Sequence, residues 1–134
     1  MKQVFTPLIW LTLSLFLLTS CTGDMINRED DGATFEYSIG SVFQVQLPGD
    51  PEAGFVWKTV GLNTGLLESQ GEPVVKTAAE TGLEQGSYTF SFKTKGAGNT
   101  ILRLMYYDKN AEDPKPEDTF EVNIISGTMG RIES

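Results

Sequence analysis

Alternation of apolar and polar residues with a period of two is the feature of this sequence that most constrains its fold. Residues 87–95 alternate most regularly, with Tyr88, Phe90 and Phe92 on one side and polar residues on the other. Residues 41–47 repeat the pattern. Because successive side chains of a β-strand point to opposite faces, this period indicates strands with one buried face.

The same reading along the chain predicts seven short strands separated by turn residues. They span residues 33–39, 41–47, 54–60, 72–78, 87–95, 100–107 and 118–126. Residues 100–107 are apolar on both faces, which predicts a central strand, and the glycines in 95–99 predict a turn before it. No segment has a convincing helical period. We therefore predict an all-β fold, an immunoglobulin-like seven-strand β-sandwich with Trp57 of the third strand in its core.

The N-terminus has the form of a lipoprotein signal peptide. Lys2 precedes an apolar run at 8–18, and the run ends in the lipobox Leu18-Thr19-Ser20-Cys21. An uncleaved anchor helix is the alternative, but this eleven-residue run is far shorter than the roughly 20 residues that a membrane-spanning helix needs. The sequence therefore predicts cleavage after residue 20 and lipidation of Cys21.

This signal implies a domain plan and a location. We expect a lipoprotein signal peptide at 1–20, a lipidated tether at 21–32, the sandwich domain at 33–126 and a flexible tail at 127–134. The protein would be exported and lipid-anchored to a bacterial membrane. Thr22, rather than Asp, follows Cys21, which favours the outer membrane or the cell surface.

Charge and residue types exclude several functions. After cleavage eighteen acidic residues face nine basic ones, and such a surface repels nucleic acid and anionic lipid headgroups. Membrane contact would come from the lipid anchor only. The chain has no histidine, and Cys21 is its only cysteine, so a thiol or imidazole enzyme and a Cys/His metal site are excluded. We expect a monomeric, non-enzymatic protein without metal or cofactor.

The connections at one end of the sandwich are the candidate binding site. In a seven-strand sandwich the B to C, D to E and F to G loops emerge at the same end. Residues 48–54 of the B to C connection contain two prolines and two glycines, which restrict the unbound loop and lower the entropy lost on binding. Local composition alone also fits a plain turn, because proline and glycine are common in turns.

The B to C connection carries a motif. Leu47-Pro48 and Phe55-Val56-Trp57 flank Asp50-Pro51-Glu52-Ala53-Gly54. This arrangement resembles the chagasin family of cysteine-protease inhibitors, in which Asn-Pro-Thr-Thr-Gly lies between Leu-Pro and an aromatic-x-Trp. Asp50 replaces the asparagine, and Glu52-Ala53 replaces the two threonines. In strand order and spacing the resemblance extends over about residues 33–125.

The family's other two loops are matched less closely. Two glycine-rich stretches, 81–87 and 96–99, compete for the D to E loop, and strand order favours the first, with the second as the E to F turn at the opposite end. The family's Arg-Pro-Trp would fall at 108–110, where the sequence reads Asp-Lys-Asn, so this motif is absent. The candidate binding residues in these loops are Gly82, Leu83, Gln85, Gly86, Tyr107, Asp108 and Lys109.

The resemblance implies a reversible, non-covalent inhibitor whose partner is a papain-like cysteine protease. The three loops would fill the active-site cleft, and residues 51–54 would lie near the catalytic cysteine. The alternative is a non-inhibitory lipoprotein that uses the same end for adhesion or for binding another envelope protein, since fold alone does not define function.

Overall fold

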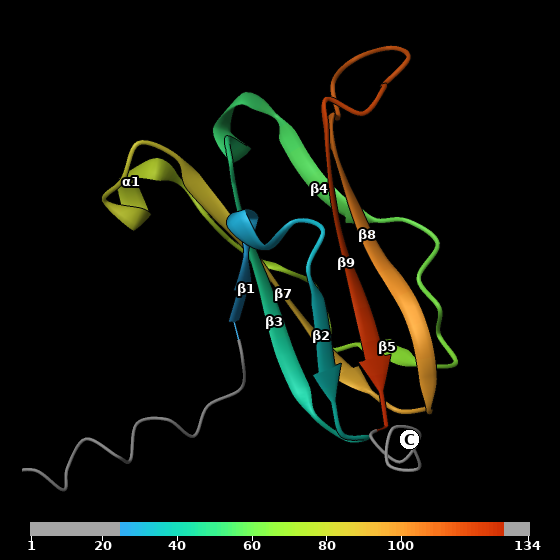
Figure 1. Cartoon of the computed structure of the whole chain (residues 1–134). Coiled ribbons are helices and arrows are strands. Elements are labelled where there is room, and N and C mark those ends of the chain that lie inside the picture. The colour runs from blue at the N-terminus through green and yellow to red at the C-terminus, as the bar shows by residue number, and fades with distance from the viewer. Residues whose placement is uncertain (1–24, 128–134) are drawn as a thin grey trace, which may run out of the picture.

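The computed structural model describes residues 25–127, which form two β-sheets packed face to face (Figure 1). The first sheet has five strands: β1 (Met25–Asn27), β3 (Val42–Gly49), β7 (Gly86–Thr94) and β5 (Leu67–Ser69) in this order, with β6 (Val74–Lys76) also paired to β7. The second has four strands: β2 (Thr34–Tyr37), β9 (Asp118–Ser126), β8 (Gly98–Asp108) and β4 (Phe55–Thr59). The predicted all-β, immunoglobulin-like sandwich is confirmed.

The core lies between the sheets and follows the period-two pattern. The residues with at most 7% exposure include Phe43, Val45, Leu47, Tyr88, Phe90, Phe92, Leu102, Leu104, Phe120, Val122 and Ile124. β8 pairs with β9 on one side and β4 on the other, as expected for a strand that is apolar on both faces. Trp57 is 4% exposed, and its indole N–H donates a hydrogen bond to the Pro48 carbonyl oxygen over 3.0 Å.

The number of strands differs from the prediction. Within residues 25–127 there are nine strands rather than seven, because β1 and β5 were not predicted. β5 is a three-residue strand with a single buried residue, Leu67, so it carries no alternation that a sequence pattern could reveal. It pairs antiparallel with β7 and extends the first sheet.

The domain begins earlier than predicted, since part of the expected tether is ordered. β1 pairs in parallel with β3, with Ile26 opposite Val45, and Ile26 is completely buried in the core. A 3₁₀ helix, η2 (Arg28–Asp30), follows directly. The reason is burial: Ile26 completes the edge of the core, although it lies between the exposed residues Met25 and Asn27.

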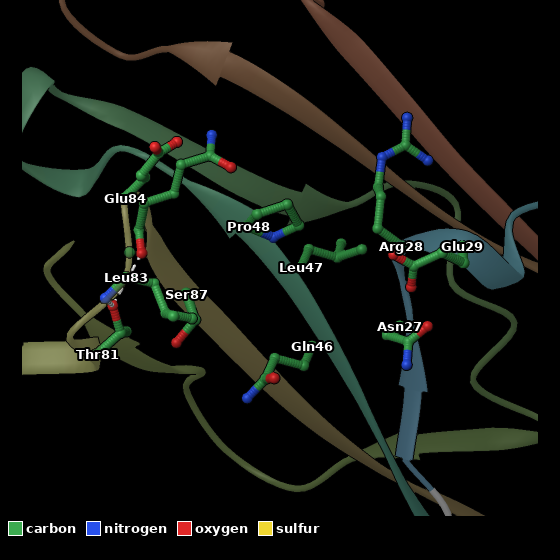
Figure 2. A pocket seen from close by; sticks show the side chains of 12 residues that line it. Asn27, Arg28, Glu29, Gln46, Leu47, Pro48, Thr81, Leu83, Glu84 and Ser87 are labelled. Carbon is green, nitrogen blue, oxygen red and sulfur yellow. Dashed lines mark hydrogen bonds between the residues drawn. The ribbon is translucent and has the colours of Figure 1, made fainter.

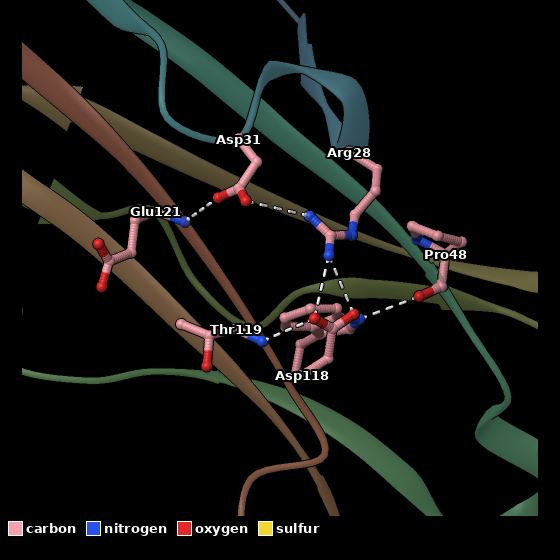
Figure 3. A network of polar contacts seen from close by, with 7 residues as sticks. Arg28, Asp31, Pro48, Asp118, Thr119 and Glu121 are labelled. Carbon is pink, nitrogen blue, oxygen red and sulfur yellow. Dashed lines mark hydrogen bonds and ion pairs between the residues drawn. The ribbon is translucent and has the colours of Figure 1, made fainter.

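Arg28 connects this N-terminal segment to the opposite sheet (Figure 3). Its Nη2 lies 3.0 Å from Asp118 Oδ1 and 3.1 Å from Oδ2, at the start of β9. The guanidinium also lies 5.9 Å from the centroid of the Phe120 ring. Asp31 accepts a 2.8 Å hydrogen bond from the Glu121 amide. Residues 25–31 therefore join β3 of one sheet to β9 of the other.

Two further short helices lie in connections. They are η3 (Pro51–Ala53), between β3 and β4, and α1 (Ala78–Thr81), between β6 and β7. In the part of the chain that the structure describes, no helix is long and apolar enough to cross a membrane. The predicted signal peptide, Cys21 and all but the first residue of the predicted tail lie outside the described residues.

Candidate functional site

Three connections converge at one end of the sandwich (Figure 1). The central loop, residues 50–54, joins β3 to β4; the second loop, 77–85, contains α1 and precedes β7; the third loop, 109–117, joins β8 to β9. Together we call them the loop surface. The competing glycines lie at the other end of β7, Gly96 in the turn at 95–97 and Gly98 at the start of β8, so the second loop is the one beside the central loop, as strand order predicted.

The central loop is a single tight turn. Pro51 begins η3, and the Ala53 amide donates a hydrogen bond to the Asp50 carbonyl oxygen over 3.2 Å. The turn ends at Gly54, whose φ of 91° lies in the left-handed region that glycine adopts without a Cβ penalty. Glu52 and Ala53 are exposed at the tip. The Pro and Gly of the motif thus produce a defined turn.

Two tyrosines hold the ends of the central loop. The Asp50 amide donates a 2.8 Å hydrogen bond to the hydroxyl oxygen of Tyr106, and the Tyr88 hydroxyl donates a 2.5 Å hydrogen bond to the Phe55 carbonyl oxygen. Burial raises the pKa of both phenols above the usual value of 10.0. Both hydroxyls therefore stay protonated in neutral solution.

The start of β7, directly after the second loop, packs against the central loop through Gly86. Gly86 pairs with Gly49 across β7 and β3. A Cβ at Gly86 would overlap the Lys76 carbonyl oxygen and lie 2.8 Å from Pro51 Cδ. The absence of a side chain at Gly86 therefore allows Pro51 to approach the backbone of the neighbouring strand.

The third loop contacts the other side of the central loop. The Lys109 amide donates a 3.0 Å hydrogen bond to the Gly54 carbonyl oxygen, and a Cβ on Gly54 would overlap Asn110 Nδ2. The Asn110 amide in turn donates a 3.0 Å hydrogen bond to Asp108 Oδ1. Asp108, Lys109 and Asn110, at the position of the missing Arg-Pro-Trp, thus support the central loop.

The remaining predicted residues of the second loop are arranged around α1. Gly82 ends the helix with φ 75°, and the Thr81 hydroxyl donates a 2.9 Å hydrogen bond to the Gln85 carbonyl oxygen. Leu83 is 73% exposed, the largest value among the exposed large hydrophobic residues of the described chain. Leu83 and Glu84 form one side of a groove of about 420 Å³, and Arg28 and Glu29 form the other (Figure 2).

Sequence reasoning selected Tyr107 but missed Tyr106. The two are adjacent on β8, so their side chains point to opposite faces. Tyr106 pairs with Trp57 and stacks on Phe55, whereas the Tyr107 hydroxyl lies 3.6 Å from Met105 Sδ. Helix α1 was also missed, although its capping box, Thr77 with Glu80 three residues later, is visible in the sequence.

The loop surface is acidic. It contains seven acidic side chains, Asp50, Glu52, Glu80, Glu84, Glu112, Asp113 and Glu117, against two basic ones, Lys109 and Lys115. Within residues 25–127 no group of three His, Cys, Asp or Glu side chains is placed to hold a metal ion. The surface offers charge, backbone groups and one exposed leucine to a partner.

Comparison with solved structures identifies folds of the same kind. The crystal structure of the cysteine protease inhibitor EhICP2 from Entamoeba histolytica is 17% identical, with a TM-score of 0.66, over 77% of this chain and 94% of that one. The solution structure of Amebosin is 16% identical, with a TM-score of 0.59, over 78% and 98%. The structure of PbICP-C in complex with falcipain-2 is 16% identical, with a TM-score of 0.41, over 78% and 92%. Among curated proteins none matches.

One protein-family model matches most of the sandwich and so identifies the family of this chain. The model for chagasin family peptidase inhibitor I42 matches residues 36–124, from β2 to β9 and through all three loops. The family consists of protease inhibitors rather than enzymes. On the strength of this match, the chain belongs to the chagasin family of peptidase inhibitors.

Proposed function

We propose that this protein is a reversible inhibitor of papain-like cysteine proteases and that it blocks the active-site cleft with the loop surface. Family membership supports inhibition of a peptidase. The single observation that supports this site is the central loop, an exposed turn held between Gly86, where β7 begins after the second loop, and Lys109 of the third loop. A narrow projection with two flanking supports fits a cleft.

The central loop would block the protease without being cleaved. Asp50 contributes its carbonyl oxygen to the amides of Ala53 and Phe55, at 3.2 and 3.3 Å, so the turn is closed on itself. Residues 51–54 would then meet the catalytic cysteine as a turn and not as an extended strand with a peptide bond in attack geometry. Since the loop is ordered before binding, less conformational entropy is lost on association.

Glu52 gives this inhibitor its own electrostatic character. The side chain is exposed at the tip of the central loop, where the family motif has a threonine. Next to the thiolate and imidazolium of a cysteine protease, its carboxylate is repelled by the first and attracted by the second. The choice of target enzyme therefore depends on how the cleft presents these two charges to Glu52.

We also propose that Cys21 carries lipid and holds the domain at the outer membrane or cell surface. Met25, where β1 starts, is only four residues after Cys21, so an extended chain would span at most about 14 Å between them. β1 runs in parallel with β3, which leads into the central loop. The peptide between the lipid and the domain would thus be short. The loop surface would lie at the end of the first sheet that is far from the lipid.

The lipid proposal has a direct test. Labelling expressing cells with a fatty acid analogue should mark the wild-type protein, and Cys21→Ser should abolish the label and release the protein from membranes. Label retained by Cys21→Ser would refute the anchor.

Inhibition is tested by titrating the fragment 22–134 against papain and cathepsin-like proteases, with trypsin as the control enzyme. We expect inhibition of the cysteine proteases at micromolar concentration or below and none of trypsin. A fragment with an intact β-sheet circular dichroism spectrum and no inhibition at micromolar concentration would refute the proposal. The result would then favour the alternative function, adhesion or binding of another envelope protein. The family match does not favour this alternative.

A further inference from the structure

We propose that Tyr88 and Tyr106 are positioning residues of the inhibitor, which set the conformation of the central loop through their hydroxyl groups. This inference rests on the proposed function for its effect on inhibition. Its structural part, that the hydroxyls order residues 50–55, can be tested independently of any protease.

The two hydroxyls act at opposite ends of the loop and come from opposite sheets. Tyr106 of β8 accepts a 2.8 Å hydrogen bond from the Asp50 amide, where the loop begins. Tyr88 of β7 donates a 2.5 Å hydrogen bond to the Phe55 carbonyl oxygen, just after the loop ends. One bond satisfies a backbone donor and the other a backbone acceptor. The loop is therefore held at both ends by side chains from strands of different sheets.

The tyrosine rings have little room to move. Tyr106 stacks on Phe55 at 5.1 Å between ring centroids, lies 4.9 Å from Trp57 and meets the edge of Tyr88 at 6.4 Å. A Cβ on Gly49 would lie 2.5 Å from Tyr88 Cε1 and 2.9 Å from the Tyr106 hydroxyl oxygen. The glycine thus lets both rings pack against the last residue of β3, and packing aims both hydroxyls at the loop.

Neither hydroxyl needs to touch a protease for this effect. Tyr88 is 2% exposed, so its contribution passes through Phe55 to the loop. Phenylalanine at either position keeps the ring and removes only the hydrogen bond. The Asp50 amide or the Phe55 carbonyl would then lose its fixed partner, and the unbound loop would sample more conformations, which weakens binding.

The test compares Tyr106→Phe and Tyr88→Phe with a matched control, Tyr37→Phe, on β2 of the second sheet near the opposite end. Backbone amide hydrogen exchange, thermal unfolding and the inhibition constant for papain are measured for each. We expect faster exchange at Asp50 and its neighbours in the loop, unchanged exchange in β3 and β7, and an inhibition constant raised by about threefold to tenfold. Tyr37→Phe should leave the loop amides and the inhibition constant unchanged.

The outcomes separate the two proposals. The positioning role of the two tyrosines would be overturned if amide exchange accelerated equally over the whole sandwich. It would also be overturned if loop exchange stayed at the wild-type rate in both variants. Faster loop exchange with an unchanged inhibition constant would also overturn it. If the wild type does not inhibit papain, the proposed function fails, while localised loop exchange would still support the structural role of the hydroxyls.

Discussion

The amide of Lys109 donates a hydrogen bond to the carbonyl oxygen of Gly54 over 3.0 Å, which joins the third loop to the end of the central loop. The family's Arg-Pro-Trp is absent at this position, and the residues present take a supporting role instead. Gly54 is thus constrained twice, by its φ of 91° and by the neighbouring Asn110 side chain.

Gly54→Ala should destabilise the domain and weaken inhibition. A left-handed conformation costs a residue with a Cβ roughly 1–2 kcal/mol, and the new Cβ would also overlap Asn110 Nδ2. Urea unfolding measures the loss. The matched control is Gly61→Ala, where φ is 64° and no atom lies within 4 Å of the added Cβ. Adding Asn110→Ala should recover part of the loss in Gly54→Ala; no recovery would mean that the overlap costs nothing.

Ile26→Ala should cost about 2–5 kcal/mol of unfolding free energy, because it leaves a cavity in the core. The matched control is Met25→Ala on the same strand, where the side chain is 44% exposed and the loss should be small. Chemical denaturation of both variants checks the start of the domain. Equal stabilities for Ile26→Ala and the wild type would assign residues 25–31 to a tether.

Glu52→Thr should change the inhibition constant by at least about tenfold, which corresponds to about 1.4 kcal/mol. The threonine restores the family's residue and removes the charge at the tip of the central loop. Glu68→Thr on β5, also exposed but outside the loop surface, is the matched control and should have no effect. An inhibition constant that stays the same across several papain-like enzymes would place Glu52 outside the contact.

Alkaline pH should weaken the fold through the two positioning tyrosines. Burial raises the pKa of Tyr88 and Tyr106, so their contribution to stability is complete below the unfolded pKa near 10.0 and is lost as pH rises toward the folded values. Unfolding free energy should fall as pH rises above 10, by at most about 1.4 kcal/mol per pH unit for Tyr88, and Tyr106 should add to this fall. Urea midpoints of the wild type and of the double phenylalanine variant measure the slope. A slope of equal size in the double variant would contradict this assignment.

The sequence predicted those strands in which apolar residues recur at every second position. Phe43, Val45 and Leu47 are buried as their alternation indicates, because a period of two places all three on one face. Ile26 and Leu67 are equally buried, yet each is the single buried residue of a three-residue strand. No period can be read from one residue, so β1 and β5 were missed.

The candidate site, too, was predicted from the sequence only in part. Strand order was sufficient to bring the three connections to one end and to choose residues 81–87 over 96–99 for the second loop. It could not distinguish Tyr106 from Tyr107, since both are aromatic and adjacent. The register of β8 with β4, which sets Tyr106 opposite Trp57, decides which of them faces the loop.

By itself, then, the sequence determined a two-sheet sandwich and the turn of the central loop, because alternation, proline and glycine act over a few neighbouring residues. Only the tertiary structure decided that Pro51 packs on Gly86, that Asn110 lies beside Gly54, and that the hydroxyls of two tyrosines hold the loop. These contacts join residues distant along the chain. They depend on the register of the strands and on the space that a missing Cβ leaves, which no local pattern encodes.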